Sequence, residues 1–162
     1  MSSILKVDQI QLSNGNTPTA GDLGLNTTGS VLQVQSNQFT NNLSSSSGQI
    51  SGGSVSITPS STSSKILFLC TMAIETLGSG SDRGVQLRLF RDSTNIKGST
   101  YNLYMSSDTT QRIGEVTMQI LDSPNTTSAV AYSFDFGPTG SNSTARAHHY
   151  GKSVLTVMEI AG

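Results

Sequence analysis

Apolar residues recur at every second position in several segments in the middle of the chain. Five apolar residues of the segment 65–77 fall at every second position: Ile66, Phe68, Cys70, Met72 and Ile74. Successive side chains of a strand point to opposite faces, so this spacing places all five on one face. The same alternation recurs in segments 84–91, 113–121 and 129–136. The pattern therefore predicts four half-buried β-strands.

Other parts of the chain between residues 31 and 162 are predicted from different signals. Residues 31–34 start the strand region, and residues 153–161 form a last strand that is apolar on both faces, which predicts a central position or a place in an interface. The Ser- and Gly-rich segments 41–53 and 137–152 are predicted to be loops. No segment has the periodicity of a helix. We therefore predict an all-β fold, an antiparallel β-sandwich of the jelly-roll type covering about residues 31–162.

The composition adds a requirement for self-association. Only 34% of the residues are hydrophobic and 12% are charged, while 28 Ser and 19 Thr occupy 47 of the 162 positions. With a net charge of −1, the chain is not disordered by charge repulsion. A chain so poor in apolar residues has a thin core, and burying surface against copies of itself would compensate. We therefore expect a homo-oligomer.

Charge and cysteine content exclude several classes of function. Nine basic residues against ten acidic ones give no basis for nucleic-acid binding. Cys70 is the only cysteine, so neither an intrachain disulfide nor a cysteine metal cluster can form, and we expect it to be a small buried hydrophobe. The chain opens without a basic, apolar signal segment, and its longest apolar run, 66–70, is too short to insert in a membrane. We expect a protein made in a cytoplasm.

Residues 1–30 differ from the rest of the chain. Turn residues follow a short apolar strip that consists of five residues: Ile4, Leu5, Val7, Ile10 and Leu12. Burying such side chains fully is worth about 1.5–3 kcal/mol each, whereas a free tail gains nothing from them. We predict that residues 1–30 form an extended docking arm and that these five residues attach it to a partner. A disordered tail is the alternative.

Candidate chemistry is sparse. Adjacent residues of a strand point to opposite faces, so His148 and His149 of one chain are poorly placed for one metal ion, although a three-fold axis could gather three copies of one histidine. The default interpretation is an exposed loop pair. The carboxylates are scattered, and no phosphate loop, nucleophile elbow or metal-ligand spacing appears. We expect no catalytic residue, no metal and no cofactor.

Aromatic residues could still contact a ligand. Tyr101 and Tyr104 lie in the polar stretch after Gly98, where they could stack on a sugar ring, although ordinary packing is the commoner role. Together with the histidine pair and Tyr150, they form the set of residues that could contact a receptor.

Four segments carry a family resemblance. They are Ser3–Gln11 with Asn14-Gly15 behind it, Ile57–Leu67, Leu121–Thr127 and Leu155–Ile160. The first resembles the N-termini of tail-fibre-like and virion structural proteins of marine and freshwater phages, cyanophages especially, and the others resemble the start, last hairpin and closing strand of their C-terminal β-domain. The resemblance implies a component of the phage virion, trimeric, with an arm that docks on other virion proteins and a β-knob that projects. A long fibre shaft is absent.

Three functions from different classes fit this sequence. The leading one is a virion building block, such as a fibre-base, knob or capsid decoration protein, whose role is stable assembly. The second is a receptor-binding module that recognises a host surface glycan with its loops. The third is a small polysaccharide depolymerase, which would need two carboxylates facing across a groove. A broad interface surface favours the first, distal aromatic residues the second, and paired carboxylates the third.

Overall fold

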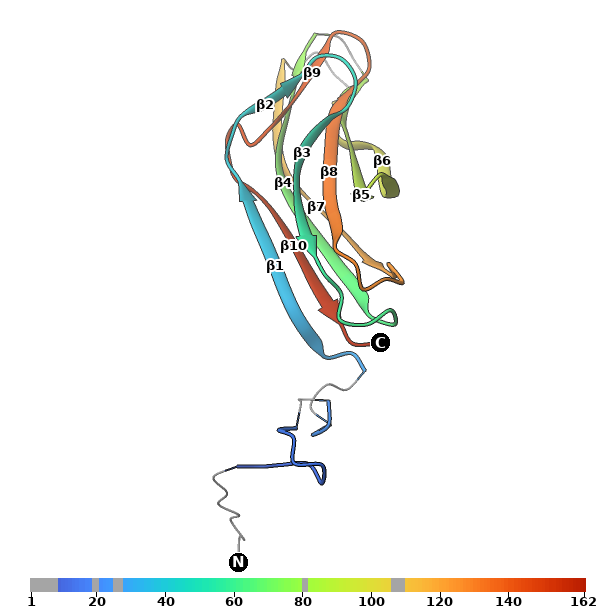
Figure 1. Ribbon diagram of the computed structural model, residues 1–162. Helices are drawn as coiled ribbons and strands as arrows, with labels where there is room; N and C mark the ends of the chain where they lie inside the picture. The colour runs from blue at the N-terminus through green and yellow to red at the C-terminus, as the bar shows by residue number, and fades with distance from the viewer. Residues whose placement is uncertain (1–8, 19–20, 25–27, 80–81, 106–109) are drawn as a thin grey trace, which may run out of the picture.

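A computed structural model describes residues 9–18, 21–24, 28–79, 82–105 and 110–162, with the side chains of residues 99–101 and 105 excepted. The described residues contain ten strands and no helix (Figure 1). In chain order the strands are β1 (Val31–Phe39), β2 (Leu43–Ser45), β3 (Ile50–Ile57), β4 (Lys65–Gly78), β5 (Arg83–Arg91), β6 (Thr94–Met105), β7 (Gln111–Asp122), β8 (Val130–Thr139), β9 (Ser143–Ala147) and β10 (Ser153–Ile160). The all-β prediction is confirmed.

The strands form two antiparallel sheets packed as a sandwich. Sheet A has the order β1-β10-β4-β7, with β9 and β2 continuing beside the second half of β4. Sheet B has the order β3-β8-β5-β6. Strand pairing is nested, since β5 pairs with β6, β4 with β7, β3 with β8 and β1 with β10. A long hairpin rolled up in this way is a jelly roll, as the sequence predicted.

The core lies between the two sheets and consists mainly of residues that alternation selected, with further core residues from segments outside them: Val55, Ile57, Leu103, Ala145 and Ala147. The five alternating residues of the segment 65–77 named above are all buried, as are their counterparts on β5 and β8: Val85, Leu87, Leu89, Val130, Tyr132, Phe134 and Phe136. On β7, Met118 is buried, and its neighbours Val116 and Ile120 pack partly buried against the core. Burial raises the pKa of the Cys70 thiol, which makes it an unreactive core side chain.

Two of the predicted loops are wrong. Segment 41–53 contains β2 and the start of β3, and segment 137–152 contains the end of β8 and all of β9. The strand β6 was also not predicted, so Tyr101 and Tyr104 lie in a strand and not in a loop. These strands are rich in Ser, Thr and Gly, so they lack apolar alternation. They form because neighbouring strands offer free backbone partners, as β8 does for β3.

The last strand has the predicted central position. β10 lies between β1 and β4 in sheet A. Leu155 and Val157 point into the core, while Val154, Met158 and Ile160 lie half-buried on the other face. Its two apolar faces therefore have separate roles, one in the core and one on the outside of the sandwich.

The arm leaves the sandwich beside the C-terminus. Gly29 N–H donates to Ala161 O and Ala161 N–H donates to Ser30 O, both at 2.8 Å, so these bonds extend the β1–β10 pairing to the end of the arm. Figure 1 shows residues 9–18 beyond this end of the sandwich, and the side chains of Ile10 and Leu23 are about half exposed. Leu12 is half-buried, while the other predicted docking residues, Ile4, Leu5 and Val7, lie outside the described residues.

Candidate functional site

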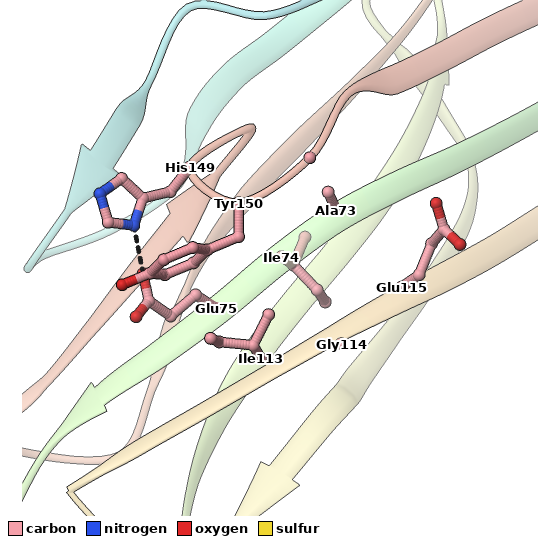
Figure 2. Close-up of a pocket in the computed structure, with 9 residues that line it drawn as sticks. Ala73, Ile74, Glu75, Ile113, Gly114, Glu115, His149 and Tyr150 are labelled. Carbon is pink, nitrogen blue, oxygen red and sulfur yellow. Dashed lines mark hydrogen bonds and ion pairs between the residues drawn. The ribbon is translucent and has the colours of Figure 1, made fainter.

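A pocket opens on the outer face of sheet A, in the half of β4 that is farther from the arm. Its volume is about 310 Å³, and its lining comes from β4, β7 and the loop before β10: Ala73, Ile74, Glu75, Ile113, Gly114, Glu115, His149, Tyr150 and Gly151 (Figure 2). The floor is apolar, and the walls carry two carboxylates and one exposed aromatic ring. Small-molecule sites combine these two features, an apolar cavity and a few fixed polar groups.

Glu75 is the buried polar centre of this pocket. It points to the outer face of the sheet, yet only 1% of it is exposed, because the side chains of Arg146, His149 and Gln111 surround its carboxylate. Its Oε2 accepts from His149 Nδ1 at 3.1 Å and lies 3.5 Å from Arg146 Nη1, while its Oε1 accepts from Gln111 Nε2. A buried carboxylate is tolerated only when it is paired in this way.

Tyr150 projects from the same network toward solvent. Its hydroxyl accepts a hydrogen bond from Gln111 Nε2 at 3.3 Å, and its ring meets the ring of His149 edge-on at 4.3 Å between centroids. The side chain is nevertheless 60% exposed. The Tyr150 ring is thus held in one position by its neighbours while most of it is exposed to solvent.

His148 fixes the loop that carries His149 and Tyr150. Its ring is only 3% exposed, stacks on Phe39 and meets Phe134 edge-on, both at 6.0 Å. The prediction of an exposed histidine pair is therefore wrong for His148. Two glycines of β3 create the space, because a Cβ at Gly52 would overlap the Phe134 ring and one at Gly53 would overlap the Phe39 ring.

Hydrogen bonds assign the protonation state of His148. Gly52 O can only accept, so His148 Nε2, 3.1 Å away, carries the proton. The Nδ1 atom then accepts from the Ser153 hydroxyl at 2.7 Å, and that hydroxyl accepts from Ala73 N–H at 3.1 Å. Burial lowers the pKa of His148, and the hydrogen bond to Gly52 only partly opposes this effect. The neutral ring therefore ties the loop to β3, β4 and β10.

A second surface lies on the outer face of sheet A, toward the arm. Val34, Met158, Leu67 and Leu121 stand directly opposite one another across β1, β10, β4 and β7. Val34 is 50% exposed and Leu121 53% exposed. We call this row, together with the two rows above it, the uncharged block. Those two rows are Ser36, Thr156, Leu69 and Gln119, then Gln38, Val154, Thr71 and Thr117.

The remaining predicted contact residues lie apart from the pocket. Tyr104 is on β6 in sheet B, 38% exposed, and its hydroxyl donates to Asp82. The side chain of Tyr101 lies outside the described residues. Of the predicted contact set, the structure therefore brings only His149 and Tyr150 into one site. Sequence reasoning missed Glu75, because an acidic residue at the end of an alternating strand looks solvent-exposed.

Two features are absent from the described part of the chain. Its His, Cys, Asp and Glu side chains form no group of three that could hold a metal ion. It also has no helix that is both long and apolar enough to cross a membrane.

Comparisons with known proteins leave the family of this chain open. No protein-family model matches it, and no curated protein sequence matches it. Among solved structures, a chain of infectious bursal disease virus strain Gx aligns with 82% of this chain at 10% identity and a TM-score of 0.45, and the VP2 subviral particle of the same virus aligns at 9% identity and 0.44. This chain spans about a third of the length of those chains (33% and 34%). TM-scores below 0.5 carry no functional conclusion.

Proposed function

We propose that this chain is a structural component of a bacteriophage particle, a homotrimer that docks on other virion proteins through residues 1–30 and projects its jelly roll outward. The observation that carries the proposal is that the arm and the pocket lie toward opposite ends of the sandwich. The arm joins the sandwich beside the Lys65 end of β4, whereas the pocket surrounds Glu75 on the same strand. Ten residues of extended strand separate these two positions by ~33 Å.

The described part of the arm supports attachment. Ile10 is 52% exposed and Leu23 is 46% exposed, so neither side chain is used by the core of its own chain. Exposed apolar side chains at the base of a projecting domain suit a partner groove, where backbone pairing and apolar pockets act together. The end of the arm is already held in a β-ladder by its bonds with Ala161.

The uncharged block supports self-association. Its twelve side chains include no acidic or basic residue, so two copies could meet without burying an unpaired charge. Val34 and Leu121 are about half exposed, and burying the exposed half of either side chain would gain about 1 kcal/mol. The surface lies on the two-sided final strand, from which the sequence predicted an interface.

A structural role without catalysis is consistent with the state of the pocket carboxylates. Hydrolysis of a glycosidic bond needs two carboxyl groups free to exchange protons and to face the substrate. Both oxygens of Glu75 are already engaged by Gln111, Arg146 and His149. We therefore propose that the chain is not an enzyme.

Deletion of the arm tests the docking function. Particles assembled with a chain lacking residues 1–25 should contain none of it, as judged by immunoblotting of purified particles. The isolated variant should keep its β circular dichroism spectrum and its oligomeric state, because Gly29, Ser30 and all strands remain. Normal incorporation of the truncated chain, or loss of its fold, would overturn the division into arm and knob.

A charge placed in the uncharged block tests the trimer. Leu121→Lys should weaken self-association at least about tenfold in sedimentation equilibrium, because a buried, unpaired ammonium is costly. Ile113→Lys is the matched control, since Ile113 lies on the same face of β7, is 50% exposed and is outside the block. A monomeric parent protein at micromolar concentration would exclude the trimer, and equal effects of the two variants would exclude this surface.

A further inference from the structure

We infer that the Glu75–Tyr150 pocket binds a neutral sugar ring, an activity that the proposed structural role does not require. A sugar ring has two chemically different surfaces. Its C–H groups form an apolar face, and its hydroxyls form a polar edge that donates hydrogen bonds. A matching site offers an aromatic or apolar surface to the face and fixed acceptors to the edge.

The size and floor of the pocket suit one ring. A volume of about 310 Å³ is at the lower end of the range for small-molecule sites. Gly151 presents no side chain, so a ligand can approach the backbone of the loop. This glycine also packs tightly on the loop's support, because a Cβ there would lie 3.0 Å from the Ala73 Cβ. The floor is therefore apolar, as the face of a ring requires.

Tyr150 supplies the aromatic surface. Its ring is 60% exposed, yet it is positioned by Gln111 and by His149, which is itself bonded to Glu75. An aromatic side chain that is already ordered loses little conformational freedom when a ligand stacks on it. Exposure without a role in the core is what distinguishes this tyrosine from Tyr132, which is fully buried.

The charges of the pocket select a neutral ring. Glu75 is paired with Arg146 and hydrogen-bonded by His149, whereas Glu115 makes no ion pair with any described residue. Figure 2 shows Glu115 apart from the cluster of Glu75, His149 and Tyr150, on the other side of the labelled pocket residues. A hydroxyl can donate to the free carboxylate of Glu115. A sugar carboxylate would be repelled by it, because like charges at close range are unfavourable.

Position gives this pocket access to a glycan. It lies on the half of sheet A farther from the arm, so a particle-bound chain would present it away from the attachment point. The ring would then be one unit of a glycan on a host surface.

Titration of the intact chain with methyl glycosides tests the inference. Saturation-transfer NMR with a neutral hexoside, an N-acetylhexosaminide and a glucuronide should show millimolar binding of at least one neutral sugar and at least about tenfold weaker binding of the glucuronide. Tyr150→Ala should weaken neutral binding about tenfold, the loss expected of an aromatic contact at the centre of a site. Tyr104→Ala is the matched control, since Tyr104 is an exposed tyrosine of the other sheet.

Glu115→Gln separates charge from hydrogen bonding. The amide oxygen still accepts from a hydroxyl but carries no charge, so the preference for the neutral sugar over the glucuronide should shrink toward equal affinity. Circular dichroism establishes that each variant is folded, and Tyr150→Leu replaces Tyr150→Ala if the latter unfolds. No neutral binding at tens of millimolar, unchanged binding in the Tyr150 variant, or equal affinity for the glucuronide in the parent chain would overturn the inference. None of these outcomes bears on docking by the arm.

Discussion

The two ends of the sandwich each bury a glutamate, and the two residues are held in different ways. Glu159, at the arm end, is 0% exposed and accepts only from neutral donors: Ser60 N–H at 2.7 Å, Ser60 Oγ at 2.6 Å and Gln33 Nε2 at 2.6 Å. Glu75, at the pocket end, is 1% exposed and is held by Arg146, His149 and Gln111. Equal burial therefore conceals two kinds of site.

The two glutamates differ in the positions of their hydrogen-bond donors. The donors to Glu159 come from β1 and from the segment before β4, so this carboxylate ties both of them to β10. The side chains of Arg146 and His149 are 35% and 30% exposed, so both can be hydrated if Glu75 is lost. The arm end is built as a rigid junction, whereas the pocket end keeps polar groups at the surface.

Removing each carboxylate should give the largest contrast. Glu159→Ala should lower the free energy of unfolding by about 3 kcal/mol, because it removes three hydrogen bonds to a carboxylate that join β1 and the segment before β4 to β10. Chemical denaturation measures this loss. The exposed Glu115→Ala is the control and should change stability by less than about 0.5 kcal/mol. A loss for Glu159→Ala as small as that of the control would mean that the junction is hydrated.

Acidification should lower the stability of the fold through two groups, Glu159 and His148, because the fold favours the deprotonated form of each. Burial raises the pKa of Glu159, but hydrogen bonds from Ser60 and Gln33 outweigh this effect and lower the pKa below its usual value. The pKa of His148 is lowered by burial. In both cases the unfolded chain binds the proton more readily, so stability falls as the pH falls.

The two groups act in separate pH ranges. The contribution of His148 should be complete above pH 6.5 and decline as the pH falls below that value, and the contribution of Glu159 should persist until the pH falls below 4.5 and disappear as it passes the folded pKa. Unfolding curves between pH 8 and 3 should show both phases. His148→Gln should remove the first phase and leave the second. Stability that rises between pH 6.5 and 5 would contradict a neutral His148.

The pocket end should tolerate the matching substitution. Glu75→Ala should cost only about 1 kcal/mol in chemical denaturation, since the freed Arg146 and His149 side chains can turn to solvent. Its clearer effect should be on Tyr150, whose exposed ring loses its support through His149 and should become more mobile in NMR relaxation measurements. A loss as large as that for Glu159→Ala would remove the distinction between the two ends.

The sequence by itself determined the faces of the regular strands. Alternation in segments 65–77, 84–91, 113–121 and 129–136 selected residues that the two sheets bury fully or in part. The reason is that residues two positions apart on a strand lie on the same face, so an alternating pattern identifies the buried face. The two apolar faces of segment 153–161 likewise predicted the central position of β10. These inferences needed only local spacing.

Only the tertiary structure decided the features that depend on contacts between distant segments. β3, with the sequence ISGGSVSI, is a strand because β8 supplies its hydrogen bonds, and its two glycines admit the rings of Phe39 and Phe134. His148 looked exposed beside His149, yet those rings and Gly52 O surround it. Glu75 became a pocket residue because β7, β9 and the loop 148–151, distant in sequence, cover one position of β4. The burial of a polar residue depends on which distant segments pack around it, and the neighbouring sequence does not specify those segments.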